Sequence, residues 1–209
     1  MNCLLCQTDS IVFEMNTFVC PECSLVFKNP ESYLSTEAEV TRYTTHQNVS
    51  TDQGYLEFLG RIIRPLKPFL PKKFYALDFG CGPGPTLSLL LEEVGGIVEN
   101  YDPIFFPDAH LLVPETYDVV TCTEVVEHFK NPQQDWETLT GLVKDNGLLA
   151  IMTLLFSKEI DYKSWWYKND TTHIVFYQKE TLNYLARKYN LEILYTDNKS
   201  ITIFKKRES

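Results

Sequence analysis

Four cysteines near the amino terminus are spaced as two pairs that can bind a metal ion. Cys3 and Cys6 form one C-x-x-C pair, and Cys20 and Cys23 form a second pair thirteen residues later. Four thiolates on two turns give the tetrahedral set that structural zinc prefers, with no position left open for catalysis. We therefore expect a Zn²⁺-binding ribbon over residues 1–30. Unligated thiols in a degenerate ribbon are the alternative, and iron is a less expected metal.

A second candidate site is a glycine-rich bend that follows an apolar segment. In "LDFGCGPGP", at residues 77–85, a strand-like run ends at Asp78 and continues into Gly80, Gly82 and Gly84. Glycine adopts positive φ without strain and lets a ligand approach the main chain closely. Backbone N–H groups at the start of the following helix favour electron-rich ligand groups. An ordinary tight turn between a strand and a helix is the alternative.

An acidic residue ends the next strand-like segment. "GIVENYD" finishes at Asp102, 24 positions after Asp78. An acid at that place can accept hydrogen bonds from the hydroxyls of a ribose. The glycines follow G-x-G-x-G rather than G-x-G-x-x-G, which disfavours a nicotinamide dinucleotide. A strand-end cap before Pro103 is the alternative role for this residue.

Three motifs together resemble those of class I S-adenosylmethionine-dependent methyltransferases. "LDFGCGPG" is similar to their first motif, and Tyr101-Asp102 is similar to the second. "YDVVTCTEVVEHF", at residues 117–129, resembles the motif of their fourth strand, including the Glu-His pair that many small-molecule members carry. The match covers about residues 74–205 and preserves the order and spacing of the motifs.

The resemblance implies S-adenosylmethionine as the cofactor and suggests which residues contact it. Asp78 and Gly80 would face its methionine end, and Asp102 would bind its ribose. Asp108 is the candidate for the acid that usually follows the third strand, because the segment around it is short. The residues implied to bind the cofactor are Asp78, Gly80, Cys81, Gly82, Gly84, Asp102, Pro103, Ile104, Thr123 and Glu124.

Two histidines are candidate catalytic bases for removing a proton from the acceptor. His128 follows the fourth strand, and a structural role in fixing the loop is equally expected. His173, in "NDTTHIVFY", precedes the last helix, where similar enzymes place acceptor-site residues; capping or packing is the alternative. A base accelerates methyl transfer when the acceptor is a hydroxyl or an acidic carbon.

Two further segments are candidates for the walls of the site. Tyr43 and His46 lie in a polar stretch that, in related proteins, folds over the cofactor as a lid, and a solvated linker is the alternative. Trp165, Trp166 and Tyr167 form an aromatic cluster that can wall a substrate pocket, since aromatic rings offer rigid apolar area with polar edges. Packing within a long loop is the alternative for these aromatic residues.

Strand-like and helix-like segments alternate from residue 74 onwards, and this pattern must position the motifs. Alternation of this kind predicts an α/β fold with a mostly parallel sheet. We expect a Rossmann-like sheet of seven strands, with an antiparallel hairpin formed by residues 191–206. The expected units are the ribbon at 1–30, a linker with a helical lid at 31–73, and a cofactor-binding domain at 74–209.

Charge limits the acceptor classes that the sequence favours. The chain carries a net charge of -9, which argues against a surface built to bind nucleic acid. We expect a methyltransferase acting on a small-molecule or protein acceptor. An RNA methyltransferase and a non-catalytic cofactor-binding module are the rivals. The RNA alternative would use a basic strip made of Arg61, Arg64, Lys67, Lys72 and Lys73.

The sequence favours a cytoplasmic location without a membrane partner. "MNCLLCQTDS" at the start lacks a positive region followed by a long apolar run, so we expect no signal peptide. The longest apolar run, at residues 148–156, is too short to span a bilayer and is typical of a buried strand. No oligomeric state follows from these patterns.

Overall fold

A six-stranded sheet forms the centre of the protein, in a computed structural model that describes residues 1–44 and 52–208. The first four strands in chain order are parallel neighbours, and the last two form an antiparallel hairpin that joins the edge of β7. In spatial order the strands are β5 (Gly96–Tyr101), β4 (Phe74–Phe79), β6 (Tyr117–Thr123), β7 (Val143–Met152), β10 (Ile201–Lys206) and β9 (Leu191–Thr196).

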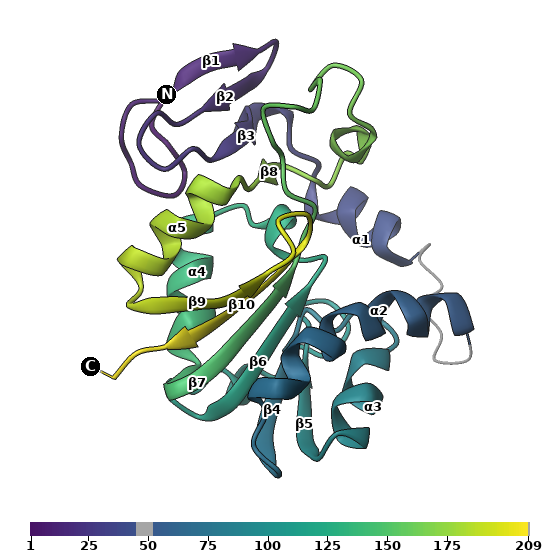
Figure 1. Ribbon diagram of the computed structural model, residues 1–209. Coiled ribbons are helices and arrows are strands. Elements are labelled where there is room, and N and C mark those ends of the chain that lie inside the picture. The colour runs from purple at the N-terminus through teal and green to yellow at the C-terminus, as the bar shows by residue number, and fades with distance from the viewer. Residues whose placement is uncertain (45–51, 209) are drawn as a thin grey trace.

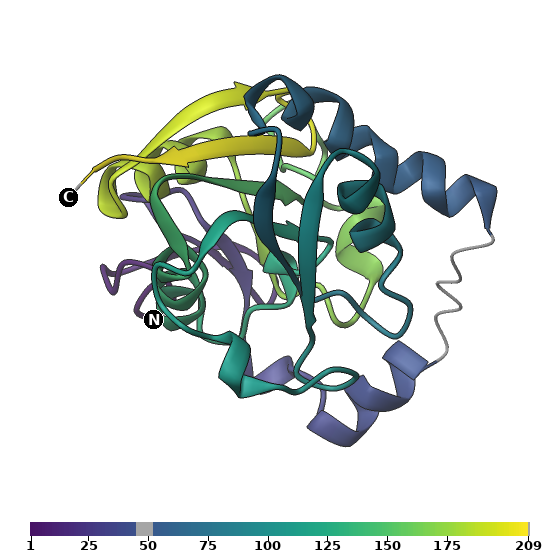
Figure 2. The same cartoon turned by 90° about the horizontal axis from the view of Figure 1, so that it is seen from below.

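Helices cover both faces of this sheet, which explains why its central strands are almost continuously apolar. Figures 1 and 2 show α2 and α3 on one face and α4 and α5 on the other. The side chain of Asp52 caps the start of α2, and Leu59, Ile62 and Leu66 bury one side of that helix against the sheet. The helices are α1 (Thr36–Thr44), α2 (Gln53–Leu66), α3 (Thr86–Glu93), α4 (Pro132–Gly141) and α5 (Lys179–Lys188).

The prediction of seven strands in the main sheet is wrong for the part of the chain that the structure describes. Residues 103–116 connect β5 to β6 and form a turn and the short 3₁₀ helix η3 (Ala109–Leu111). A crossover to another parallel strand needs a dozen or more residues besides the strand itself. This connection is too short for both, so β5 forms the edge of the described sheet.

A second, antiparallel sheet combines the amino-terminal ribbon with a strand from the other half of the chain. Its order is β1-β2-β3-β8, and Val26 and Phe27 of β3 pair with Phe176 and Val175 of β8. Figure 1 shows this sheet at the top of the view, next to α5. The ribbon is therefore tied directly to the segment between β7 and α5. Its strands are β1 (Ile11–Glu14), β2 (Thr17–Val19), β3 (Val26–Lys28) and β8 (Val175–Phe176).

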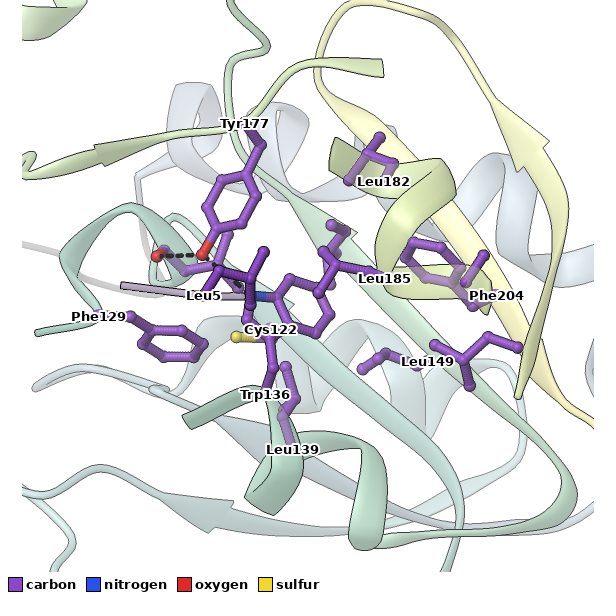
Figure 3. Close-up of a cluster of buried hydrophobic side chains, with 14 of the residues drawn as sticks. Leu5, Cys122, Phe129, Trp136, Leu139, Leu149, Tyr177, Leu182, Leu185 and Phe204 are labelled. Atoms are coloured by element: carbon purple, nitrogen blue, oxygen red, sulfur yellow. Dashed lines mark hydrogen bonds between the residues drawn. The ribbon is translucent and has the colours of Figure 1, made fainter. Parts of the chain in front are cut away.

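The ribbon and the main sheet share one hydrophobic core. Leu5 and Phe27 of the ribbon belong to the same buried cluster as Trp136 of α4, and Figure 3 shows Leu5 beside Trp136 and Tyr177. The indole N–H of Trp136 donates to the hydroxyl of Tyr177 at 3.0 Å, and that hydroxyl donates to the carbonyl of Val126 at 3.0 Å. The indole N–H and the phenol hydroxyl thus both have hydrogen-bond partners, so burying these two rings carries little free-energy penalty.

We predict that Phe27→Ala lowers the stability of the whole protein rather than of the ribbon alone. Phe27 is fully buried in the shared core, and truncating such a ring costs about 3–5 kcal/mol. Urea unfolding, followed by tryptophan fluorescence and by far-ultraviolet circular dichroism, should show one transition at lower denaturant in both signals. Met15→Ala, at a side chain that is 93% exposed, is the matched control and should shift stability by less than about 0.5 kcal/mol. Separate melting of the ribbon would contradict the shared core.

Candidate cofactor and acceptor site

The glycine-rich bend lies at the carboxyl end of β4, where parallel sheets bind their ligands. Gly80 and Gly82 adopt φ values of 78° and 66°, which is the positive φ expected from the sequence. The backbone N–H groups of Gly80 and Cys81 donate to the carbonyl of Tyr101 at 2.7 and 3.1 Å. A Cβ atom on Gly80 would lie 2.4 Å from Cγ2 of Val125. Only glycine fits this position, because both the φ value and the available space exclude a side chain.

Asp102 joins the glycine bend to the turn that follows β5. Its Oδ2 atom accepts from the N–H of Gly82 at 3.1 Å, and its Oδ1 atom accepts from Ile104 and Phe105 at 2.8 and 3.0 Å. A carboxylate offers about four lone-pair positions, so about one is left for a ligand hydroxyl. The side chain of Asp102 is nearly buried. A hydrogen bond from a ligand to this carboxylate is therefore stronger than one at the protein surface.

Asp78 is a buried carboxyl group at the end of β4. The hydroxyl of Thr121 donates to its Oδ1 atom at 2.8 Å. Burial raises the pKa of Asp78 to about 7, the Thr121 hydrogen bond lowers it, and the charge of Asp102 raises it further. Near neutral pH this group can therefore become charged when a cationic ligand group approaches.

Thr123 ends β6, and Glu124 follows it in a half-buried position. Glu124 has a φ of 55°, and its N–H donates to the carbonyl of Met152 at 2.7 Å. Burial, and then the nearby charge of Glu127, raise the pKa of Glu124 to about 8. Tyr55 of α2 lies close enough to Asp78 and Glu124 for their charges to add to burial in raising its pKa to about 12. The sequence placed Tyr55 in a helix but gave no indication that its ring lies near these two carboxyl groups.

His128 and His173 come together from separate parts of the chain. Their rings are 4.9 Å apart between centroids. Nδ1 of His128 lies 2.8 Å from the carbonyl of Thr172, and Nδ1 of His173 lies 2.9 Å from the carbonyl of Tyr167. A carbonyl only accepts, so each Nδ1 carries a hydrogen and each neutral ring keeps its lone pair on Nε2.

Glu127 completes this cluster and was not among the residues predicted from the sequence. One ligand atom from each of Glu127, His128 and His173 lies within 4.8 Å of the others. Glu127 is fully buried, and the hydroxyl of Tyr167 donates to its Oε1 atom. The short 3₁₀ helix η4 (Val126–His128) presents Glu127 and His128 side by side. The motif that contains both residues was visible in the sequence, but their inward orientation depends on this turn.

The three aromatic residues predicted to wall a pocket, between β7 and β8, lie in three different environments. Trp165 packs against Phe156 and Phe176, with ring centroids 5.3 and 5.2 Å apart, so packing describes its role. Trp166 is 69% exposed. Tyr167 belongs to the short helix η5 (Trp166–Asn169) and faces Glu127. The predicted aromatic wall is thus reduced to Tyr167 at the histidine cluster.

Helix α1 lies against the histidine cluster. The hydroxyl of Tyr43 is 3.2 Å from Nδ1 of His128. Arg42 forms an ion pair with Asp170 at 2.9 Å, and Glu39 forms one with Lys130 at 2.7 Å. These contacts bring the segment before the main sheet to the site. His46, the other residue considered for a lid, lies outside the described residues.

The four amino-terminal cysteines converge as their spacing predicts. The Sγ atoms of Cys3 and Cys23 are 3.5 Å apart, those of Cys6 and Cys20 are 3.3 Å apart, and all four lie within 4.8 Å of one another. A zinc tetrahedron with Zn–S bonds of about 2.3 Å has edges of about 3.8 Å. The backbone N–H of Leu5 points at Cys3 Sγ at 3.4 Å, which favours a thiolate. This donor set fits a tetrahedral zinc ion.

The basic strip considered for RNA is divided between the two ends of the sheet. Arg61 of α2 donates to the hydroxyl of Ser200 at 2.9 Å and interacts electrostatically with the half-buried carboxyl of Glu124. Lys72 and Lys73 precede β4, whereas the glycine bend follows it. The six residues of β4 separate the two by about 20 Å at the usual rise per residue. The strip therefore does not gather beside the site.

A family model described as a methyltransferase domain matches residues 52–196, which is more than half of the chain. The chain belongs to this family. The match confirms the family that the sequence motifs predicted. It begins at α2, so the ribbon lies outside the matched residues.

Curated relatives of this methyltransferase-family chain are named as ubiquinone biosynthesis O-methyltransferases. It is 30% identical over 123 residues to a mitochondrial ubiquinone biosynthesis O-methyltransferase from Schizosaccharomyces pombe, covering 47% of this chain and 44% of that protein. It is 36% identical over 78 residues to a ubiquinone biosynthesis O-methyltransferase from Colwellia psychrerythraea, covering 37% and 31%. The chain thus spans less than half the length of these relatives.

Solved structures share the fold at low sequence identity. A SAM-dependent methyltransferase from Methanosarcina mazei superposes with a TM-score of 0.52 at 14% identity, covering 69% of this chain and 98% of that one. The PH0226 protein from Pyrococcus horikoshii superposes with a TM-score of 0.54 at 15% identity, covering 80% and 99%. These likenesses support the α/β fold. Within residues 1–44 and 52–208, no helix has the length and apolar character needed to cross a membrane.

We predict that Asp78 makes the protein less stable as the pH rises. Its pKa is about 7 in the folded chain against 3.8 for an ordinary aspartate. Between these values the folded state holds a proton that the unfolded state has released, so raising the pH favours unfolding. The difference amounts to about 3 kcal/mol between pH 4 and pH 7. Urea unfolding at several pH values should show this loss in the native chain and a flatter profile in Asp78→Asn.

Asp108→Asn is the matched control for this pH profile. Asp108 caps the short helix η3 through the N–H of His110 and is exposed. Its substitution should leave the pH dependence of unfolding unchanged. If Asp78→Asn and the native chain lost stability in parallel from pH 4 to pH 7, the buried carboxyl would not be the cause.

Proposed function

We propose that this chain transfers a methyl group from S-adenosylmethionine to a hydroxyl oxygen of a small molecule. The observation that carries the proposal is the placement of two chemically different groups at neighbouring strand ends. The glycine bend and Asp102 lie at the ends of β4 and β5, whereas Glu127 and His128 follow β6 and are joined there by His173 from the loop before β8. Relatives named as O-methyltransferases support oxygen as the accepting atom.

Binding of the cofactor would use the groups that remain available around the glycine bend. We assign the ammonium of its methionine end to Asp78, whose raised pKa of about 7 lets a cation draw out the charged form. Asp102 would accept from the ribose, Pro103 and Ile104 would flank the adenine, and Thr123 with Glu124 would border the sulfonium. The cofactor supplies a methyl group already activated by a positively charged sulfur.

The residues of the acceptor side would orient a hydroxyl and take its proton. As the new O–CH₃ bond forms and the S–CH₃ bond breaks, the O–H proton passes to an Nε2 lone pair of His128 or His173. Burial, with the nearby His128, lowers the pKa of His173, which keeps its ring neutral and able to accept. Alignment of the two reactants and exclusion of water supply much of the rate in such a transfer. The base adds to that rate for a hydroxyl acceptor.

The ribbon would bind a structural zinc ion through Cys3, Cys6, Cys20 and Cys23. Converging sulfurs and a matching tetrahedral size support this assignment. A zinc ion with four thiolates has no open position, so its role would be to hold the ribbon fold. Because β3 pairs with β8, the metal would also stabilise the segment that carries His173. The unit boundaries at residues 30 and 73, and the cytoplasmic location, stay predictions.

The proposal predicts cofactor-dependent methylation of hydroxylated small molecules. Purified, zinc-loaded protein should transfer label from methyl-labelled S-adenosylmethionine to members of a panel of dihydroxyarenes, giving labelled methyl ethers. Asp102→Asn should weaken the binding of S-adenosylhomocysteine, measured by calorimetry, about 10- to 100-fold. Its charge-assisted hydrogen bond to the ribose is worth about 1.5–3 kcal/mol.

Asp118→Asn is the matched control for the cofactor measurement. Asp118 lies at the start of β6, where it bonds Lys144 and the N–H of Tyr75, away from the carboxyl ends of the strands. Its substitution should leave the affinity for S-adenosylhomocysteine unchanged. Failure of the folded native chain to bind either S-adenosylmethionine or S-adenosylhomocysteine would end the proposal. Labelling of RNA or protein in place of small molecules would redirect it.

We predict one tightly held zinc ion per chain at the cysteine cluster. Elemental analysis after dialysis against a weak chelator should find one equivalent in the native protein and none in Cys20→Ser, because three thiolates hold the ion far less tightly. Cys122→Ala, at a buried cysteine in β6 outside the cluster, should retain the full equivalent. Zinc retention in Cys20→Ser equal to that of the native chain would show that the four sulfurs do not hold it.

A further inference from the structure

We propose that Glu124 is the counter-charge of the sulfonium: its carboxyl gives up a proton when S-adenosylmethionine binds and takes one up again when the sulfur becomes neutral. Glu124 is then the residue that distinguishes the methyl donor from its demethylated product. The inference rests on the proposed function, which places the sulfonium beside Glu124. It goes further because it follows the positive charge that methyl transfer removes from the sulfur.

Glu124 lies beside the glycine bend, at the same edge of the sheet. It follows the last residue of β6, which is the parallel neighbour of β4, and the next residue, Val125, packs against Gly80 of the bend. The charges of Asp78 and Glu124 both act on the hydroxyl of Tyr55, so the two carboxyl groups lie near the same side chain of α2. A sulfonium held at the bend is therefore within reach of the Glu124 carboxyl.

The hydroxyl of Tyr167 lies between two carboxyl groups but carries only one hydrogen. It donates that hydrogen to Oε1 of Glu127, and its oxygen is 3.5 Å from Oε2 of Glu124. A carboxylate only accepts hydrogen bonds, whereas a protonated carboxyl also donates one. The contact between Tyr167 and Glu124 is therefore satisfied when Glu124 carries a proton and donates it to the tyrosine oxygen. This arrangement favours the neutral form of Glu124 as long as no cation is nearby.

The charges around Glu124 act in the same direction. Burial, and then the charge of Glu127, raise the pKa of Glu124 to about 8. A hydrogen bond from Tyr167 lowers this pKa, but the structure gives the hydrogen of that hydroxyl to Glu127. The charge of Arg61 also lowers it, yet Arg61 is exposed, so water screens its effect. A cation within about 4–6 Å lowers a carboxyl pKa by about 1–3, enough to ionise Glu124 at neutral pH.

Methyl transfer removes the positive charge of the sulfur and releases one proton from the acceptor. As the S–CH₃ bond breaks and the O–CH₃ bond forms, this proton passes to Nε2 of His128 or His173. It then moves to the carboxylate of Glu127, whose Oε2 atom has no hydrogen-bond partner among the described residues. Glu124 takes a proton from the Tyr167 hydroxyl as that hydroxyl regains one from Glu127. The sulfur and Glu124 both end neutral, so the net charge of the site is unchanged.

The test is calorimetric binding of S-adenosylmethionine and S-adenosylhomocysteine to zinc-loaded protein at pH 7, in buffers of different ionisation enthalpy, which counts the protons released. Both ligands carry the ammonium assigned to Asp78, so a proton released from Asp78 is common to both. In the native chain S-adenosylmethionine should release about one proton more than S-adenosylhomocysteine. Its affinity relative to S-adenosylhomocysteine should rise up to about tenfold per pH unit below the pKa of Glu124. Both effects should vanish in Glu124→Gln, which has the shape of the protonated acid.

Glu93→Gln is the matched control, because Glu93 is an exposed acid at the end of α3, opposite the end that begins at the glycine bend. It should show the native difference in proton release. Native protein that binds both ligands with equal proton release would overturn this inference alone and leave the proposed function in place. An undiminished difference in Glu124→Gln would show that another group is the counter-charge. A folded native chain that bound neither ligand would overturn the proposed function and the inference together.

Discussion

The pairing of β3 with β8 is the constraint on which the arrangement of Glu127, His128 and His173 depends. Two residue pairs join the ribbon to the long segment between β7 and α5, and the backbone N–H of Lys28 extends the contact to Ile174 at 2.9 Å. The N–H of Ile174 donates in turn to the carbonyl of Glu127 at 2.9 Å. His173 is thereby placed beside η4. A ribbon that looks like a separate module in the sequence is thus joined to the segment that carries His173.

Buried carboxyl groups at the strand ends give the site its chemical character. Asp78 and Glu127 lie in the interior and Glu124 is half-buried, and the pKa values of Asp78 and Glu124 are raised chiefly because water is excluded from them. Such groups oppose folding unless a partner compensates them. A cationic ligand group at these strand ends would compensate the cost of burying them.

The motifs predicted the geometry of the glycine bend well, because that bend is local in sequence; its role in binding the cofactor stays a prediction. The glycine bend, its positive φ values and the neighbouring Asp102 all lie within about one strand–helix–strand unit, whose geometry is widely shared. The strand count failed because the connection after β5 is shorter than the usual crossover. Trp165 was undecided in the sequence, since an aromatic residue in a loop serves packing and binding equally well; its burial against Phe156 and Phe176 assigns it to packing.

The sequence by itself determined the alternating α/β fold, the glycine bend with its two acids, and the convergence of the four cysteines. Each of these follows from local spacing, because backbone conformation and side-chain period are set within a few residues. Only the tertiary structure brought His173 to His128 and turned Glu127 inward beside them. That meeting joins segments 45 residues apart through the ribbon's strand pairing and a shared core. Long-range packing of this kind leaves no periodic signal in the chain.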